Sequence, residues 1–146
     1  MAFENGPFVQ FACFCDMILE DKTGAVSLIR IVDTINHTVS NPNPPDKMPP
    51  LHVSLKLAIA FKSGSSIGRH DFKIVPELPN GSTLDPIDLS VYFKGEEKGC
   101  NVIVPMDLIC ELEGLYWFEV FIDNEKITSI PLRIRYNRIV LGRQQL

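Results

Sequence analysis

The chain has 146 residues, of which 45% are hydrophobic and 22% charged, and its formal net charge is −4 at pH 7. This size and composition are typical of one globular domain with its own core, and they argue against disorder along most of the chain. The negative charge argues against binding to nucleic-acid backbones, which needs a clustered basic field. We therefore expect a single domain over residues 1–146 with no nucleic-acid partner.

The apolar runs are short and the N-terminal residues are not basic. No stretch approaches the roughly 20 apolar residues of a membrane span. Residues 1–10 contain Glu4 but no Lys or Arg, unlike a secretory signal. We therefore expect a cytoplasmic protein with no membrane partner. The four cysteines, for which neither local pairing has an easy disulfide geometry, are expected to be buried free thiols. They are Cys13, Cys15, Cys100 and Cys110.

Strand-like patterns dominate the first half of the chain. Residues 8–19 are apolar on both faces, which predicts a central strand, and a turn around Gly24 leads into residues 26–35 as the second arm of a hairpin. Residues 36–50 contain five prolines and predict a long extended loop. Residues 51–62 then alternate apolar and polar side chains, which predicts a strand with one face on a core.

The second half of the chain repeats the period-two pattern in shorter segments. The strands expected there are residues 69–78, 87–93, 100–110, 115–123 and 126–136. Pro105 and Pro131 lack an N–H and place their strands at an edge or a bulge. Residues 137–146 mix arginines with aliphatic residues and predict a short C-terminal extension.

These segments together predict an all-β fold. About eight short strands with frequent turns and no helical period are typical of an antiparallel β-sandwich, immunoglobulin-like or jelly-roll-like. A closed barrel is the alternative. The Cys…Trp…Cys order of antibody domains is absent, because Trp117 follows all four cysteines.

Gly64–Gly68 matches the G-x-S-x-G motif of serine hydrolases, with Ser66 at the position of the nucleophile. That mechanism needs a strand–turn–helix elbow and a histidine well beyond it in the chain. Here the segment links two predicted strands, and the only later histidine, His70, follows four residues on. We interpret the motif as a hairpin loop, and we predict no catalytic residue.

The sequence gives little support for a metal site or for a catalytic carboxylate. The three histidines, His37, His52 and His70, lie in separate segments, and no calcium-loop motif occurs, so we predict no metal and no cofactor. Asp16 and Asp33 lie on apolar strands that are expected to pair. Such carboxylates either have perturbed pKa values and a function, or they face solvent or accept backbone hydrogen bonds.

The outer face of residues 115–123 is the candidate interaction surface. Trp117 and Phe121 are predicted to point away from the core, near Arg133 and Arg135 on the next strand. Aromatic side chains beside arginines have the composition of a protein interface. The alternative is that a loop or the C-terminal segment covers them.

Several short motifs are spread over nearly the whole chain. They are Cys15-Asp16, Gly24–Ile35, Gly68–His70, Gly114–Val120 and Ser129–Leu132. Together they resemble an uncharacterised bacterial family, a domain of unknown function, whose opening hairpin reads C-D, glycine turn, S-L-I-G-I-F-D. The chain departs from it at Arg30, where the family usually has glycine, and at Val32, which is often aromatic. The resemblance implies a single β-sandwich of bacterial or phage genomes, and it implies no activity and no catalytic residue.

The sequence identifies no biochemical activity. We expect a noncatalytic protein-binding or assembly module that uses the Trp117 and Phe121 face or the loop of residues 36–50, with a protein partner or self-association. One alternative is a hydrolase-type enzyme whose carboxylate and histidine site assembles only in three dimensions. The other is a structural component of a phage-like particle that assembles through exposed strand edges.

Overall fold

The computed structural model describes residues 4–142, and the regular secondary structure in this range consists of β-strands alone. The seven strands are β1 (Phe8–Glu20), β2 (Val26–Val32), β3 (Thr34–Asn41), β4 (Leu51–Glu77), β5 (Ile87–Cys110), β6 (Gly114–Ile122) and β7 (Glu125–Val140). The predicted all-β class is confirmed, and the predicted number of about eight strands becomes seven in the described residues. The same residues contain no helix long and apolar enough to cross a membrane.

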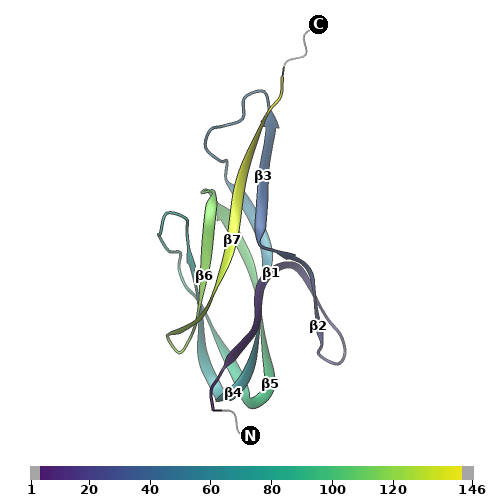
Figure 1. Ribbon diagram of the computed structural model, residues 1–146, viewed down its shortest axis with the longest axis vertical. Helices are drawn as coiled ribbons and strands as arrows, with labels where there is room; N and C mark the ends of the chain where they lie inside the picture. The colour runs from purple at the N-terminus through teal and green to yellow at the C-terminus, as the bar shows by residue number, and fades with distance from the viewer. Residues whose placement is uncertain (1–3, 143–146) are drawn as a thin grey trace.

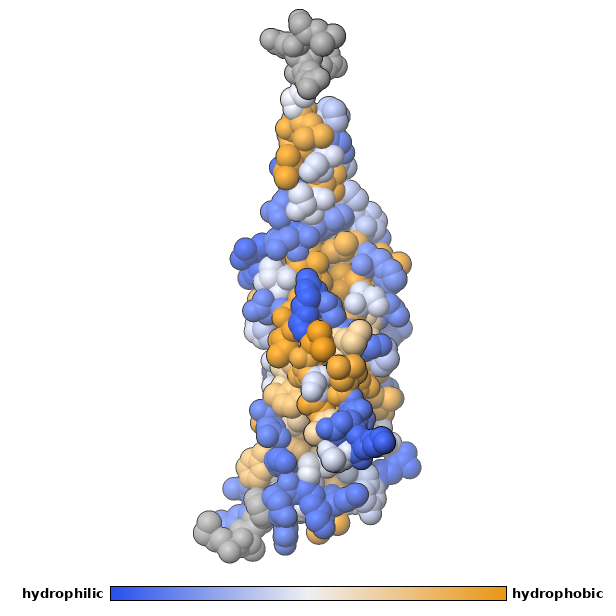
Figure 2. All heavy atoms as spheres, turned by 90° about the vertical axis from the view of Figure 1, so that its right-hand side faces the viewer, coloured by the Kyte–Doolittle hydropathy of each residue, from blue (hydrophilic) through white to orange (hydrophobic). Residues whose placement is uncertain are grey.

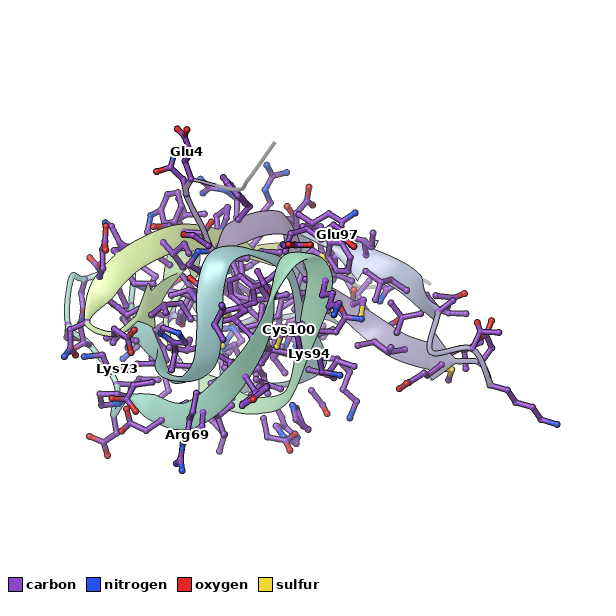
Figure 3. The ribbon with its side chains drawn as sticks, turned by 90° about the horizontal axis from the view of Figure 1, so that it is seen from below. Glu4, Arg69, Lys73, Lys94, Glu97 and Cys100 are labelled. Atoms are coloured by element: carbon purple, nitrogen blue, oxygen red, sulfur yellow. The ribbon has the colours of Figure 1, made fainter. Side chains whose placement is uncertain are left out.

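Two long strands replace four of the predicted ones. Predicted strands 51–62 and 69–78 are parts of β4, and predicted strands 87–93 and 100–110 are parts of β5. The two long strands form one antiparallel ribbon that pairs from Leu51↔Cys110 to Ile74↔Ile87. Viewed from below, this ribbon bends over one end of the molecule, and Arg69 points away from the core (Figure 3).

The G-x-S-x-G segment lies inside β4, so its interpretation as a hairpin loop is wrong. Gly64 pairs with Glu96 of β5, and the register shifts on both sides of Gly64 mark a bulge. Gly64 has φ +59°, a conformation that glycine adopts without steric cost. The bulge lets the strand change direction while it stays paired, and it turns β4 from one half of the sheet toward the other.

The predicted strand 26–35 divides at Asp33 into two elements with different partners. β2 pairs antiparallel with β1, whereas β3 pairs in parallel with β7. The prediction of a purely antiparallel sheet is therefore wrong, and the sheet is mixed. Residues 36–41 of the predicted loop and 137–140 of the predicted C-terminal extension are strand residues, because each segment supplies hydrogen bonds to the other.

The strand order is β2-β1-β4-β6-β7-β3, with β5 as a further partner of β4. β1 pairs with the first part of β4, up to Lys62, and β6 pairs with its last part, from Phe72 onward. β4 therefore carries the sheet around the core, and the sheet curls (Figure 1). Its two terminal strands, β2 and β3, follow one another in the chain.

The core lies inside this curl. Phe14 of β1 and Phe118 of β6 are 1% and 0% exposed, and their rings meet edge to face with centroids 4.8 Å apart. At the bend, Phe61 packs edge to face on Phe93 at 5.8 Å. The side chains predicted to point inward from the first part of β4 are buried, including Leu55, Leu57 and Ile59.

Candidate functional site

The predicted interaction surface lies on the outer face of β6 and β7. Trp117 is 36% exposed and lies between Glu77 of β4 and Pro131 of β7. Arg133 and Arg135 are exposed farther along β7, where Arg133 pairs with Leu115 rather than with Trp117. The C-terminal end of β7 does not cover Trp117, because residues 137–140 pair with β3.

Phe121 does not extend the Trp117 surface. It is half-buried, and the ammonium group of Lys73 lies 5.0 Å from its ring centre as a cation–π contact. Glu119 stands between Trp117 and Phe121 on the same face; its carboxylate accepts a hydrogen bond from Ser129 and lies 3.5 Å from the Lys126 ammonium. The structure thus places the predicted residues on one side of the sheet but not in one apolar patch.

A larger apolar surface lies on the β1–β2 hairpin, which projects from the body (Figure 1). Four aliphatic side chains are exposed there: Met17 (52%), Leu19 (50%), Ile29 (43%) and Ile31 (63%). The register pairs Met17 with Ile29 and Cys15 with Ile31, which places all four on one face of the hairpin. The view onto this side shows hydrophobic residues gathered across the middle of the molecule (Figure 2).

The other face of the hairpin turns toward the body. Ile18, Val26 and Leu28 line a small apolar cavity together with Phe11 and Ala58. The face that carries Met17 and Ile31 is not part of this lining, and both side chains stay more than half exposed. Below, "hairpin face" means Met17, Leu19, Ile29 and Ile31.

Sequence reasoning missed the hairpin face because residues 8–19 are apolar on both sides and were predicted to form a central strand. β1 is central only up to Cys15, which pairs with Lys56 of β4, and beyond that point β1 pairs with β2 alone. The available signal was the alternation of large aliphatic residues in both arms of the hairpin.

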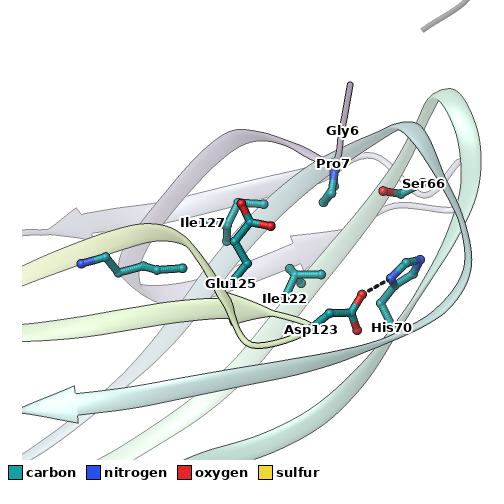
Figure 4. A pocket seen from close by; sticks show the side chains of 9 residues that line it. Gly6, Pro7, Ser66, His70, Ile122, Asp123, Glu125 and Ile127 are labelled. Atoms are coloured by element: carbon teal, nitrogen blue, oxygen red, sulfur yellow. Dashed lines mark hydrogen bonds and ion pairs between the residues drawn. The ribbon is translucent and has the colours of Figure 1, made fainter. Parts of the chain in front are cut away.

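A cavity of about 270 Å³ lies beside the bend of β4 and includes Gly6 and Pro7 of the N-terminal segment (Figure 4). His70 of β4 and Asp123 of the β6–β7 turn form part of its wall, with His70 Nδ1 2.5 Å from Asp123 Oδ2. His70 Nε2 lies 3.1 Å from the carbonyl oxygen of Ile67. Because both neighbours are acceptors, both ring nitrogens donate only when the imidazole is protonated.

The two groups shift each other's proton affinity. The hydrogen bond to Asp123 raises the pKa of His70, and the Ile67 carbonyl adds to this effect. The bond from His70, together with the amide of Asp71, lowers the pKa of Asp123. The pair is therefore most stable as an ion pair.

Ser66 lines the same cavity, so the structure brings together the three residue types of a serine hydrolase triad. Sequence reasoning missed this because Asp123 lies 53 residues beyond His70. His70 is not available as a base for Ser66, however, because its Nε2 donates to the carbonyl of Ile67 instead of facing the Ser66 hydroxyl. The described segment after Ser66 also continues as a strand and not as the helix of a nucleophile elbow.

Of the two carboxylates named from the sequence, only Asp16 lines a cavity together with a histidine. The Asp16 carboxylate lies 2.7 Å from the Arg30 guanidinium. Asp16 and His52 line the same open cavity of about 360 Å³, but the partner of His52 is Asp107, whose carboxylate oxygen lies 3.3 Å from His52 Nε2. Asp33 is not part of this cavity wall, and its carbonyl accepts a hydrogen bond from the amide of Arg133. Among residues 4–142 no three His, Cys, Asp or Glu side chains lie close enough to hold a metal.

All four cysteines are free thiols, but the predicted burial holds only for two of them, since Cys13 and Cys100 are half-buried. Cys15 and Cys110 are buried at 0% and 2% exposure. Burial raises the pKa of both thiols, and it also raises the pKa of Cys13. A raised pKa keeps a thiol protonated near neutral pH, so none of these three groups is a good nucleophile.

The rest of the proline-rich loop, residues 42–50, is fastened to the body. The Tyr136 hydroxyl donates to the carbonyl of Pro45 at 2.6 Å, and the Arg138 guanidinium donates to the carbonyl of Pro44 at 3.0 Å. Met48 inserts into the core with 5% of its surface exposed. The loop is therefore a packed crossover, in which Asp46 and Lys47 stay exposed between the anchored positions.

A family comparison covers most of the chain. A family of unknown function, DUF6941, matches residues 10–135. The chain belongs to the DUF6941 family. The predicted membership of an uncharacterised family is confirmed at this level, while the hairpin motif and the bacterial source stay predictions. A sequence comparison with curated proteins finds no significant match to this DUF6941 member.

Solved structures with a similar arrangement are distant. A β-glucosidase from Listeria innocua matches with a TM-score of 0.47 and 10% identity over 74% of this chain, which spans only 15% of that enzyme. An immunoglobulin-like protein from Pseudomonas aeruginosa matches at 0.44 and 10% identity, over 90% of this chain and 98% of its own. The CARDB domain of a Pyrococcus furiosus protein, solved with di-metal ions, matches at 0.42 and 10% identity over 92% of both chains. At these scores none supports an argument about function.

Proposed function

We propose that this DUF6941 member is a noncatalytic protein-binding module that assembles with a second copy of itself through the hairpin face. The observation that carries the proposal is the exposure of four large aliphatic side chains, between 43% and 63%, on one side of a projecting two-stranded hairpin. Contiguous exposed apolar surface of this kind marks interaction sites in soluble proteins. A cytoplasmic location, a bacterial source and an immunoglobulin-like sandwich arrangement of the curled sheet belong to the same proposal.

The charge distribution favours a second copy as the partner. Side chains alternate along a strand, so Asp16 and Arg30 lie on the face opposite to Met17 and Ile29 and bond each other there. The hairpin face itself carries no charged side chain among residues 15–19 and 27–31. Two copies, each with a net charge of −4, can therefore bring these faces together without opposing like charges at the contact. Two-fold pairing of identical patches is the commonest symmetry of homo-oligomers.

Packing of side chains accounts for the contact better than extension of the sheet. β2 is a terminal strand of the sheet, and a free strand edge can pair with another chain. Arg30, however, has φ +57° in the middle of β2, which interrupts the extended backbone that continuous edge pairing needs. The interface is accordingly assigned to the face of the hairpin and not to its edge.

Sedimentation velocity over a wide range of protein concentrations tests the proposal. We expect a monomer–dimer equilibrium for the wild type and a monomer for Ile31→Lys and Met17→Lys, since a buried lysine at the contact lacks a partner charge. Ile67→Lys is the matched control, because Ile67 is 73% exposed but lies at the bend of β4, and it should dimerise as the wild type does. A wild type that stays monomeric at every concentration would overturn the proposal.

The surface that carries Trp117, Phe121, Arg133 and Arg135 supports the same function less strongly. Glu119 interrupts it, and Lys73 covers the Phe121 ring. Trp117→Ala should leave the dimerisation constant unchanged, and loss of association in that variant would move the proposed interface to β6 and β7.

One observation favours a second candidate function, a serine hydrolase: Ser66, His70 and Asp123 border one cavity. Its chemistry would need His70 to exchange its bond to Ile67 for one to the Ser66 hydroxyl. Labelling of the wild type, but not of Ser66→Ala, by a fluorophosphonate probe would establish an activated serine. The noncatalytic proposal expects equal, background labelling of both.

A further inference from the structure

The turn between β6 and β7 is fastened to β4 by an unusually dense set of hydrogen bonds. The amide of Asp123 donates to the carbonyl of Asp71 at 2.9 Å, and the amide of Asp71 donates back to Asp123 Oδ1 at 3.0 Å. The second carboxylate oxygen bonds His70 at 2.5 Å. One carboxylate therefore holds two consecutive residues of β4, and the turn itself runs through left-handed residues, Asp123 at φ +49° and Asn124 at +66°.

The imidazole of His70 is held in place by its surroundings. Its side chain is 23% exposed, and its ring lies edge-on to Phe93 of β5 with centroids 5.4 Å apart. In this position Nδ1 faces the Asp123 carboxylate and Nε2 faces the Ile67 carbonyl. A neutral imidazole has one N–H, so loss of the proton leaves a nitrogen lone pair pointing at an oxygen that also has only lone pairs.

We propose that His70 and Asp123 form a proton-operated latch, closed while His70 carries its proton, that holds the β6–β7 turn on β4 beside the cavity of about 270 Å³. Deprotonation of His70 leaves one N–H, which stays on Nδ1 because the charged Asp123 carboxylate is the stronger acceptor. The bond from Nε2 to the Ile67 carbonyl is lost, and the bond to Asp123 loses its ionic part, so the hold on the turn weakens. The two bonds between Asp71 and Asp123 remain, so the turn stays attached to β4 but opens more often by local fluctuation.

The charges that face His70 set the pH at which the latch opens. From the turn, Asp123 favours the cation, and so does Asp71 on β4 itself. Glu125 and Lys126 of β7 line the same cavity with opposite signs. The contact from β5 is the uncharged ring of Phe93, and the N-terminal segment contributes Gly6 and Pro7, which carry no charge. The balance favours protonation, in agreement with a pKa of His70 raised above its ordinary 6.5, so the latch stays closed to a higher pH than that at which a free imidazole loses its proton.

An NMR titration of the full chain between pH 5 and 9 tests the latch. The ring signals of His70 should report two donating nitrogens at the acid end and a midpoint above 6.5. The amide signals of Asp71, Asp123 and Asn124 should move with that same midpoint. Hydrogen-exchange protection of the Asp123 amide, corrected for the intrinsic rate, should fall roughly tenfold across it, the effect of one lost charge-assisted bond.

Three variants separate the latch from general pH effects. In His70→Gln the turn signals should no longer titrate. In Asp123→Asn, which suits a left-handed position, the His70 midpoint should fall toward 6.5 and the turn transition should follow it. His52→Gln removes a comparable but well-exposed histidine–aspartate pair and should change neither. Turn signals that do not titrate in the wild type, or that still titrate in His70→Gln, would overturn the proposal.

Discussion

Phe118→Ala should be among the most destabilising single substitutions in this chain. Phe118 is 0% exposed and packs edge to face on Phe14 at 4.8 Å, so truncation opens a cavity that the surrounding strands cannot fill. Such changes cost about 3–5 kcal/mol, of which the aromatic pair accounts for about 0.5–1.5 kcal/mol. A domain of this size has an unfolding free energy of about 5–15 kcal/mol, so the loss is a large fraction of the total.

Urea unfolding followed by circular dichroism measures this loss, with Tyr92→Ala as the control. Tyr92 is an aromatic strand residue that is 63% exposed, and its truncation should cost under about 1 kcal/mol. A double-mutant cycle with Phe14→Leu and Phe118→Leu isolates the contact between β1 and β6, strands that each pair with a different part of β4. We expect a coupling of about 0.5–1.5 kcal/mol. Strictly additive effects of the two substitutions would refute the curl that brings these strands together.

Three other predictions concern the backbone and the ion pairs. His70→Gln should lower the unfolding free energy by about 1 kcal/mol at pH 6. The raised folded-state pKa of His70 stabilises the fold fully below the unfolded-state pKa of 6.5, and this stabilisation is lost as the pH rises through the folded-state pKa. Equal losses of unfolding free energy at pH 6 and pH 9.5 in denaturant titrations would contradict this. Gly64→Ala should lower the unfolding free energy by over about 2 kcal/mol, because Gly64 has φ +59° and an added Cβ would also collide with the carbonyl oxygen of Asn5. Gly24 has φ +87° but an added Cβ there meets no atom within 4 Å, so Gly24→Ala should cost about 1 kcal/mol, as measured by thermal denaturation. Arg30→Gly should raise the melting temperature, because the backbone strain of a non-glycine residue at φ +57° outweighs the exposed ion pair between Arg30 and Asp16. A clear decrease in melting temperature would show that the ion pair contributes more than the strain costs.

The parts of the fold that the sequence predicts are those that a local pattern controls. Residues 51–62 alternate because one face meets the core, and the structure buries Leu55, Leu57 and Ile59 as expected. The predicted ends of strands were wrong where one local feature is compatible with two structures. Gly64 and Gly68 have positive φ, which suits a hairpin turn and a bulge equally, and only the pairing with β5 shows that β4 continues.

Long-range pairing accounts for the other errors. β3 pairs with residues 133–140, about a hundred positions away, so its strand character cannot be read from the polar residues near the prolines. The approach of Asp123 to His70 depends on the same kind of distant contact, between the β6–β7 turn and β4. The hairpin face was missed for a different reason: a period of two separates the faces of a strand but does not distinguish a neighbouring strand from solvent.

The molar mass in solution tests most directly whether two copies of the chain associate through the hairpin face. Light scattering coupled to gel filtration should give twice the 16.4 kDa of the chain for the wild type and for Ile67→Lys at high concentration. Ile31→Lys should give 16.4 kDa at the same concentration and retain the circular dichroism spectrum of the wild type. A mass of one chain for the wild type, or of two chains for Ile31→Lys, would show that the hairpin face is not the contact.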